Sequence, residues 1–175
     1  MTNGKTFAGA YRYLQQARSI MPKHTFQSIE DLKQAVGQEV AVTDWLTMTQ
    51  DRVQQFADAT GDHNWIHVDV ERSRRESPFK ETIAHGFLTL SLLAYFMGEA
   101  IGIKSGVRMG LNYGLNKVRW VSPVRVGSKI RARFTLASVK DVDGNGVEAL
   151  YNATVETEGG TKPACVAEWL VRLYR

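Results

Sequence analysis

A chain of 175 residues is the size of one ordinary domain with at most a short extension, so two full catalytic domains do not fit. Hydrophobic residues make up 43% and charged residues 23%, alongside 15 Gly and 4 Pro, and these proportions exclude collagen-like and wholly disordered chains. Lys and Arg exceed Asp and Glu by 22 to 18, and the net charge of +4 is a mild excess that suits an anionic ligand as well as a nucleic acid.

The sequence predicts a basic N-terminal extension over residues 1–24 and a single domain over residues 25–175, with Pro22 marking the boundary between them. The extension lacks the uninterrupted apolar run of a secretory signal, so we do not expect export. A transit peptide stays open beside a helical or frayed extension. The chain has a single cysteine, Cys165, and so no intrachain disulfide, which favours a reducing compartment and a cytoplasmic location.

The first half of the domain is expected to be rich in helices. After a short strand at residues 39–43, Thr49 has the residue type of a helix N-cap, and a helix should run from Gln50 to Thr60. Gly61 can adopt the left-handed conformation that ends this helix, and the polar residues after it favour a loop. A second short helix is expected over residues 70–76, between a capping Asp and a terminating Pro.

A long apolar segment over residues 86–103 follows. Its length of about 18 residues is the minimum for a membrane span. It contains Thr89, Ser91 and Glu99, which a membrane helix disfavours. We therefore expect a helix that begins near Gly86 and is buried against a sheet, with no membrane contact.

The second half of the domain alternates apolar and polar residues, which is typical of antiparallel strands. Turn residues at 143–146 and at 159–160 separate the alternating runs. A change of parity predicts a β-bulge near Asn116. The runs cover residues 113–121, 130–136, 147–155 and 165–173. The sequence therefore predicts an α+β domain in which a curved antiparallel sheet wraps one long apolar helix.

The most informative residues lie between these two halves. Residues 56–69 read FADATGDHNWIHVD, and His85-Gly86-Phe87 opens the apolar helix. This pattern resembles the motif of the MaoC-like (R)-specific enoyl-CoA hydratases, FAxxTGDxNxxH followed by AHGF. The resemblance extends over residues 39–125, and the combination with Trp65 is most similar to the NodN-like branch of the family.

The resemblance implies a hot-dog fold and the reversible hydration of trans-2-enoyl-CoA to (R)-3-hydroxyacyl-CoA in fatty-acid metabolism, without a cofactor. It assigns catalysis to Asp62 and His67, and it assigns binding of the thioester oxygen to the backbone N–H of Gly86. The substrate-binding candidates are Gly86, Asn64, Trp65 and His85.

These residue types also suit the reaction on chemical grounds. Addition of water to an unsaturated thioester needs one group that takes a proton from the water attacking C3 and a proton source for C2. An imidazole beside a carboxylate can exchange these protons near neutral pH. A helix N-terminal N–H can stabilise the negative charge that develops on the thioester oxygen.

Each candidate residue also has a structural alternative. Asp62 can bond its own loop backbone, as we expect of Asn64, and His67 can be a core histidine with satisfied hydrogen bonds. Trp65 either lines an acyl tunnel or anchors its loop. His85 is expected to shape the loop ahead of the helix.

No metal site is expected, although His63 and His67 have i, i+4 spacing, because Gly61 ends the helix that would align them. Cys165 is expected to pack in the core. Basic residues over 72–75 and 129–133 are candidates for coenzyme A phosphates, but a solvated face is the expected role for most of them.

Three other functions compete with the hydratase. A hot-dog acyl-CoA thioesterase would direct an activated water at C1, and a non-enzymatic module would only bind an acyl group. A nucleic-acid binder is not expected, since no recognisable nucleic-acid motif is present. We also expect a homodimer with the site at or near the interface, because the single sheet leaves an edge strand unpaired.

Overall fold

The computed structural model describes residues 23–175, so most of the basic extension expected over residues 1–24 lies outside the described residues. The helices are α2 (Ile29–Gln34), α3 (Gln50–Thr60), α4 (Trp65–Val68), α5 (Val70–Glu76) and α6 (Gly86–Ala100). The strands are β1 (His24–Phe26), β2 (Glu39–Val42), β3 (Leu46–Thr47), β4 (Ile101–Ile103), β5 (Met109–Trp120), β6 (Lys129–Val142), β7 (Gly146–Thr157) and β8 (Cys165–Tyr174). The division of the chain at residue 24 stays a prediction.

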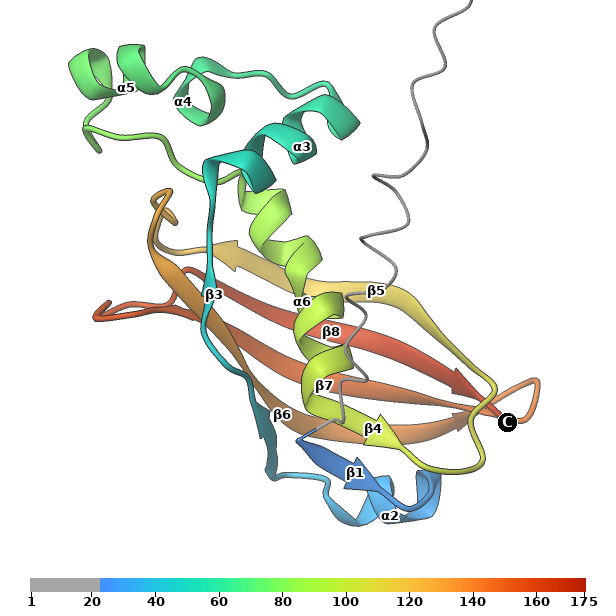
Figure 1. Cartoon of the computed structure of the whole chain (residues 1–175). Coiled ribbons are helices and arrows are strands. Elements are labelled where there is room, and N and C mark those ends of the chain that lie inside the picture. The colour runs from blue at the N-terminus through green and yellow to red at the C-terminus, as the bar shows by residue number, and fades with distance from the viewer. Residues whose placement is uncertain (1–22) are drawn as a thin grey trace, which may run out of the picture.

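A six-stranded antiparallel sheet curves around α6, while α3, α4 and α5 gather beyond the N-terminal end of that helix (Figure 1). The strand order is β2-β6-β7-β8-β5, and β3 also pairs with β6. A separate two-stranded parallel sheet joins β1 to β4. This arrangement confirms the predicted α+β layout of a sheet wrapped around one helix.

Helix α3, which carries the first residues of the motif, has the ends that its sequence predicts. The hydroxyl of Thr49 accepts a hydrogen bond from the N–H of Arg52, and Asp51 lies in the first turn near the positive end of the helix dipole. Gly61 ends the helix in the left-handed region at φ 78°. The helix therefore ends at Thr60, and Gly61 leads the chain into the loop that carries Asp62.

The strands follow the predicted parity but are longer than the alternating runs. The register of β5 against β8 shifts between Leu115 and Lys117, which confirms the bulge predicted at Asn116. A second shift lies between Asn112 and Gly114. Strand β5 is the edge of the main sheet, and most of its residues are exposed on both faces.

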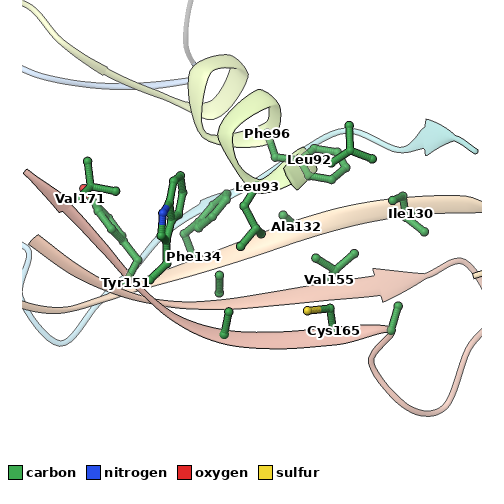
Figure 2. Close-up of a cluster of buried hydrophobic side chains, with 14 of the residues drawn as sticks. Leu92, Leu93, Phe96, Ile130, Ala132, Phe134, Tyr151, Val155, Cys165 and Val171 are labelled. Atoms are coloured by element: carbon green, nitrogen blue, oxygen red, sulfur yellow. The ribbon is translucent and has the colours of Figure 1, made fainter. Parts of the chain in front are cut away.

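The core lies between α6 and the concave face of the sheet, as Figure 2 shows. Leu92, Leu93 and Phe96 point from the helix toward apolar side chains of the three central strands, all of them buried. Cys165 belongs to this core, where burial raises the pKa of its thiol to about 11, so the expected packing role is confirmed. The helix ends at Ala100, and among the described residues no helix is long and apolar enough to cross a membrane.

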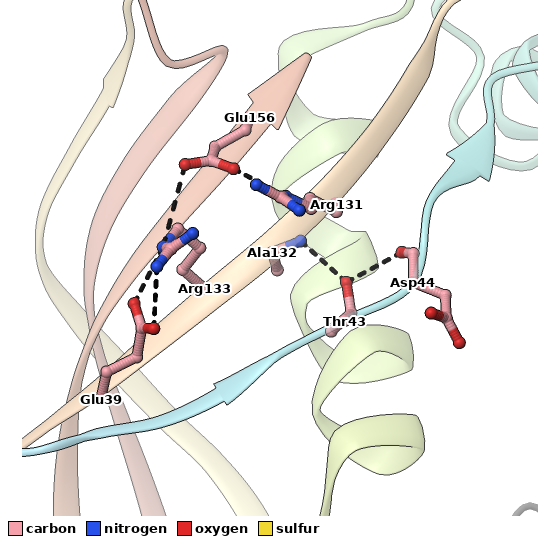
Figure 3. A network of polar contacts seen from close by, with 7 residues as sticks. All are labelled: Glu39, Thr43, Asp44, Arg131, Ala132, Arg133 and Glu156. Carbon is pink, nitrogen blue, oxygen red and sulfur yellow. Dashed lines mark hydrogen bonds and ion pairs between the residues drawn. The ribbon is translucent and has the colours of Figure 1, made fainter. Parts of the chain in front are cut away.

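The outer face of the sheet carries paired charges (Figure 3). The guanidinium of Arg133 binds both carboxylate oxygens of Glu39 at 2.8 Å, and Arg131 binds Glu156 at 2.7 Å. In the same region the Thr43 hydroxyl accepts a hydrogen bond from the N–H of Ala132 and joins β2 to β6. The guanidinium groups of Arg131 and Arg133 are therefore engaged by carboxylates of the chain itself.

Candidate active site

His67 is held by its backbone and by its ring. The residue lies in α4 and is buried, and the side-chain amide of Gln50 donates a hydrogen bond to its carbonyl at 2.7 Å. The Nδ1 atom lies 2.7 Å from the carbonyl oxygen of Ile83. A carbonyl only accepts hydrogen bonds, so Nδ1 carries the proton and Nε2 is left with its lone pair. His67 is thus oriented as a base.

The surroundings of His67 favour its neutral form. Burial lowers the pKa of His67 below its ordinary value of 6.5, and the neighbouring His85 lowers it further. The hydrogen bond to Ile83 and the carboxylate of Asp62 oppose this effect and raise the pKa of the ring. The net lowering keeps the imidazole ready to accept a proton at neutral pH.

Asp62 stands beside this ring on the loop between α3 and α4. Its carboxylate, His67 and His85 each offer an atom that lies within 4.8 Å of those of the other two. The Asp62 side chain is exposed and accepts a hydrogen bond of 3.4 Å from the N–H of Asn64. The structure therefore brings the two expected catalytic residues together, with the carboxylate on the open side of the pair.

Gly86 is the first residue of α6. The side chain of His85, the N-cap residue, makes no capping hydrogen bond to this helix, so the first-turn N–H groups lack a side-chain partner from the cap. A pocket of about 260 Å³ opens beside the helix end. It is lined by His67, Ile83, Ala84, Gly86, Thr89, Ala164 and residues 120–124. His67 and Gly86 thus share one pocket.

Trp120 is a residue of this site that the sequence did not point to. Its indole Nε1 donates a hydrogen bond of 2.7 Å to the carbonyl oxygen of Gly86, and its ring packs on Phe87 with centroids 4.9 Å apart. A Cβ atom placed on Gly86 would lie only 2.9 Å from Nε1. The indole of Trp120 therefore covers one side of Gly86.

Two of the candidate residues, Asn64 and Trp65, make contacts away from the pocket lining of the described chain. The Asn64 side chain accepts a hydrogen bond from the N–H of Ile66 and caps α4. The guanidinium of Arg72 lies over the Trp65 indole at 4.4 Å from the ring centre. These contacts match the loop-anchoring alternative, and a contact of either residue with substrate stays a prediction.

Most of the charged candidates outside the pair have partners of their own. His63 is exposed, and its Nε2 atom lies 3.9 Å from Asp58. Among the basic residues considered for coenzyme A phosphates, Arg72 pairs with Glu76 and Arg74 with Glu71. In the part of the chain that the structure describes, the residues close enough together to hold a metal are Asp62, His67 and His85, and one ring nitrogen of each histidine bonds to a backbone carbonyl.

The arrangement can carry out proton transfer next to an activated carbonyl. An imidazole lone pair and a carboxylate stand together, and a helix N-terminus with uncapped N–H groups opens on the same pocket as the imidazole. A carbonyl oxygen placed at Gly86 would meet donors that need no rearrangement when negative charge develops.

Comparison with known proteins agrees with this geometry. Residues 31–157 match the model of the MaoC like domain. The 3-hydroxyacyl-thioester dehydratase Z of Mycobacterium tuberculosis (strain ATCC 25618 / H37Rv) is 53% identical over 148 residues, which cover 85% of this chain and 97% of that protein. Nodulation protein N of Rhizobium leguminosarum bv. viciae is 44% identical over 143 residues, covering 82% and 89% of the two chains.

Among solved structures, the unliganded R-hydratase PhaJ1 of Pseudomonas aeruginosa superposes with a TM-score of 0.61 at 22% identity, covering 80% of this chain and 82% of that one. That similarity supports the hot-dog fold that the motif implied. The match over residues 31–157 and the identity to two relatives along most of their length show the family. The chain belongs to the MaoC-like dehydratases.

Proposed function

We propose that the protein is a hydro-lyase that interconverts a trans-2-enoyl thioester and its (R)-3-hydroxyacyl thioester in fatty-acid metabolism. The observation that carries the proposal is that Asp62 lies beside His67, while His67 and Gly86, at the N-terminus of α6, line one pocket. The names of the relatives support the same chemistry, since one is a 3-hydroxyacyl-thioester dehydratase and another an R-hydratase.

In the proposed mechanism, His67 and Asp62 are the acid–base pair. Nε2 of His67 takes a proton from the water that attacks C3, and the pair returns one proton to C2, so the elements of water add across the double bond. The thioester oxygen becomes negative as C3 is attacked, and the N–H of Gly86 stabilises it. Dehydration follows the same path in reverse. No cofactor or metal takes part in this scheme.

The substrate is proposed to be an acyl-CoA thioester, with no nucleic acid or membrane as partner, and the location to be cytoplasmic. An acyl chain attached to acyl carrier protein presents the same reacting atoms, so both carriers belong in the assay. The cytoplasmic location rests on the single buried cysteine and is tested by fractionation of the native host.

We further propose that the protein works as a homodimer joined along β5. This strand lies at the edge of the sheet and pairs only with β8 among the described strands. It exposes a row of large apolar side chains, which a second copy would cover: Met109, Leu111, Tyr113, Leu115 and Trp120. Because Trp120 also lines the pocket, such an interface would lie next to the site.

The deciding experiment is a hydration assay with short and medium trans-2-enoyl-CoA esters and with the matching acyl carrier protein thioesters. A free-thiol assay runs beside it. Loss of the double bond without release of thiol is the expected result. Release of thiol would identify a thioesterase, and binding of acyl-CoA without either reaction would identify an acyl-binding module.

A further inference from the structure

His85 is buried, although its position at the start of a helix usually serves a capping side chain. It is the N-cap residue of α6 and is only 2% exposed, yet its ring forms no hydrogen bond with the first turn. The pocket beside Gly86 does not have His85 among its lining residues in the described chain. Capping therefore does not account for this side chain, and its contact with substrate stays a prediction.

The ring instead joins the parts of the site that come from different segments. Nε2 lies 2.9 Å from the carbonyl oxygen of Asp62, and since a carbonyl only accepts, Nε2 carries the proton and donates. The ring also stacks on that of His67 with centroids 3.8 Å apart and planes inclined by 31°. On a further side it packs against Phe56 of α3 at 5.0 Å.

The hydrogen bond between His85 and Asp62 joins residues that are 23 positions apart in the sequence. The other hydrogen bonds of Asp62 go to residues only two positions away, and their donor–acceptor distances are long. The N–H of Asp62 reaches the Thr60 hydroxyl at 3.5 Å, and its carboxylate accepts from Asn64 at 3.4 Å. Both partners belong to the same turn, so they can move together with Asp62. The contact with His85 fixes the loop to the start of α6.

We propose that His85 is a positioning residue, which holds the Asp62 loop in a fixed place relative to His67 and to the N-terminus of α6. This inference rests on the proposed hydratase function and adds to it, because Asp62 and His67 would act there on the substrate while His85 acts through them. His85 and Asp62 are titratable neighbours that shift the pKa of His67, His85 lowering it and Asp62 raising it. Removal of the His85 ring should therefore also change the titration of His67.

The test compares His85→Phe, which keeps an aromatic ring but loses the donor, with His85→Gln, whose amide can donate to the same carbonyl. His63→Gln is the matched control, since it removes an exposed histidine next to Asp62. We expect His85→Phe to lower kcat by about a hundredfold, the cost of a small misplacement of reacting groups, with KM little changed. His85→Gln should recover roughly tenfold of this loss, and the control should equal the unmodified protein.

The pH profile separates positioning from a general loss of structure. Both variants remove a group that lowers the pKa of His67, so the acid limb of kcat/KM should move to higher pH, even in His85→Gln. Nuclear magnetic resonance of the His67 ring should show the same rise. Because this titration needs no substrate, it tests His85 even if the unmodified protein has no hydratase activity, which would refute the proposed function alone.

Three results would overturn the inference. A folded His85→Phe variant with normal kcat would show that the hydrogen bond to Asp62 is not needed. A raised KM with normal kcat would make His85 a substrate-binding residue. If His85→Phe does not fold, His85→Gln decides the question, and an unchanged His67 titration together with unchanged kcat in that variant would refute the role.

Discussion

Replacement of Gly86 by Ala tests whether the start of α6 binds the thioester. The new methyl carbon would lie 2.9 Å from Nε1 of Trp120 and 3.0 Å from two ring carbons, closer than such atoms approach, so the indole must turn away. Its hydrogen bond to the Gly86 carbonyl is then lost at a cost of about 1 kcal/mol. The gain of Ala over Gly is roughly 0.5–1 kcal/mol in the middle of a helix and smaller at this first position, so stability should fall by about 1 kcal/mol or less.

Activity should respond differently from stability. The methyl group and the displaced indole both crowd the N–H that is proposed to bind the thioester oxygen. A lost donor of this kind costs about 3–4 kcal/mol in the transition state, which corresponds to a fall of roughly a hundredfold or more in kcat/KM. Initial rates of enoyl-CoA hydration and thermal unfolding are measured on the same preparation.

Gly98 provides a matched control within the same helix. A Cβ atom added there meets nothing within 4 Å, so Gly98→Ala should not move a neighbouring side chain. It should stabilise the helix slightly, because Ala has a higher helix propensity than Gly. We expect it to be as active as the unmodified protein. Normal kcat/KM in Gly86→Ala, or an equal loss in Gly98→Ala, would refute the placement of the thioester oxygen at Gly86.

Further predictions concern the acid–base pair, its titration, the edge strand and metals. His67→Ala and Asp62→Asn should each fold, by circular dichroism, and lower kcat at least about a hundredfold; retention of a third of the activity would exclude the assignment. Because the pKa of His67 is lowered, the acid limb of kcat/KM should lie below pH 6.5. The free energy of unfolding should decrease as the pH falls from 6.5 to the pKa of His67 in the folded protein, because over this range only the unfolded state gains the proton. Light scattering should give the dimer mass, and Leu111→Glu should shift it toward the monomer; a fully active monomer would refute the interface. Dialysis against a chelator should leave hydration unchanged, and recovery of a lost activity by added metal would contradict the metal-free scheme.

The parts of the fold that depend on neighbouring residues were predictable. The cap of α3 at Thr49, its end at Gly61 and the bulge at Asn116 each follow from residue types within a few positions. The burial of α6 also followed, since a helix that is apolar on nearly all sides needs a sheet around it. The motif predicted Asp62 and His67 as a pair, and the structure places them together.

The remaining features depend on contacts between distant segments. Trp120 meets Gly86 across 34 residues, and the alternation of β5 gives no sign that one of its exposed side chains covers the start of a helix. The parallel pairing of β1 with β4 is equally remote from any local pattern. Residue types give the chemistry of a side chain, but its partners are set by the way in which the sheet closes around the helix.

The segment just before α6 explains how such distant parts reach a fixed geometry. The N–H of Ile83 bonds to the carbonyl of Ile66 at 3.0 Å while its own carbonyl accepts from the ring of His67. On either side, the N–H of Ala84 donates to Val124 at 2.8 Å and the carbonyl of Thr82 accepts from Val126 at 2.9 Å. Backbone bonds therefore hold α4, which carries His67, and the connection between β5 and β6 to one short stretch. A change in the length of this stretch would therefore separate His67 from Gly86.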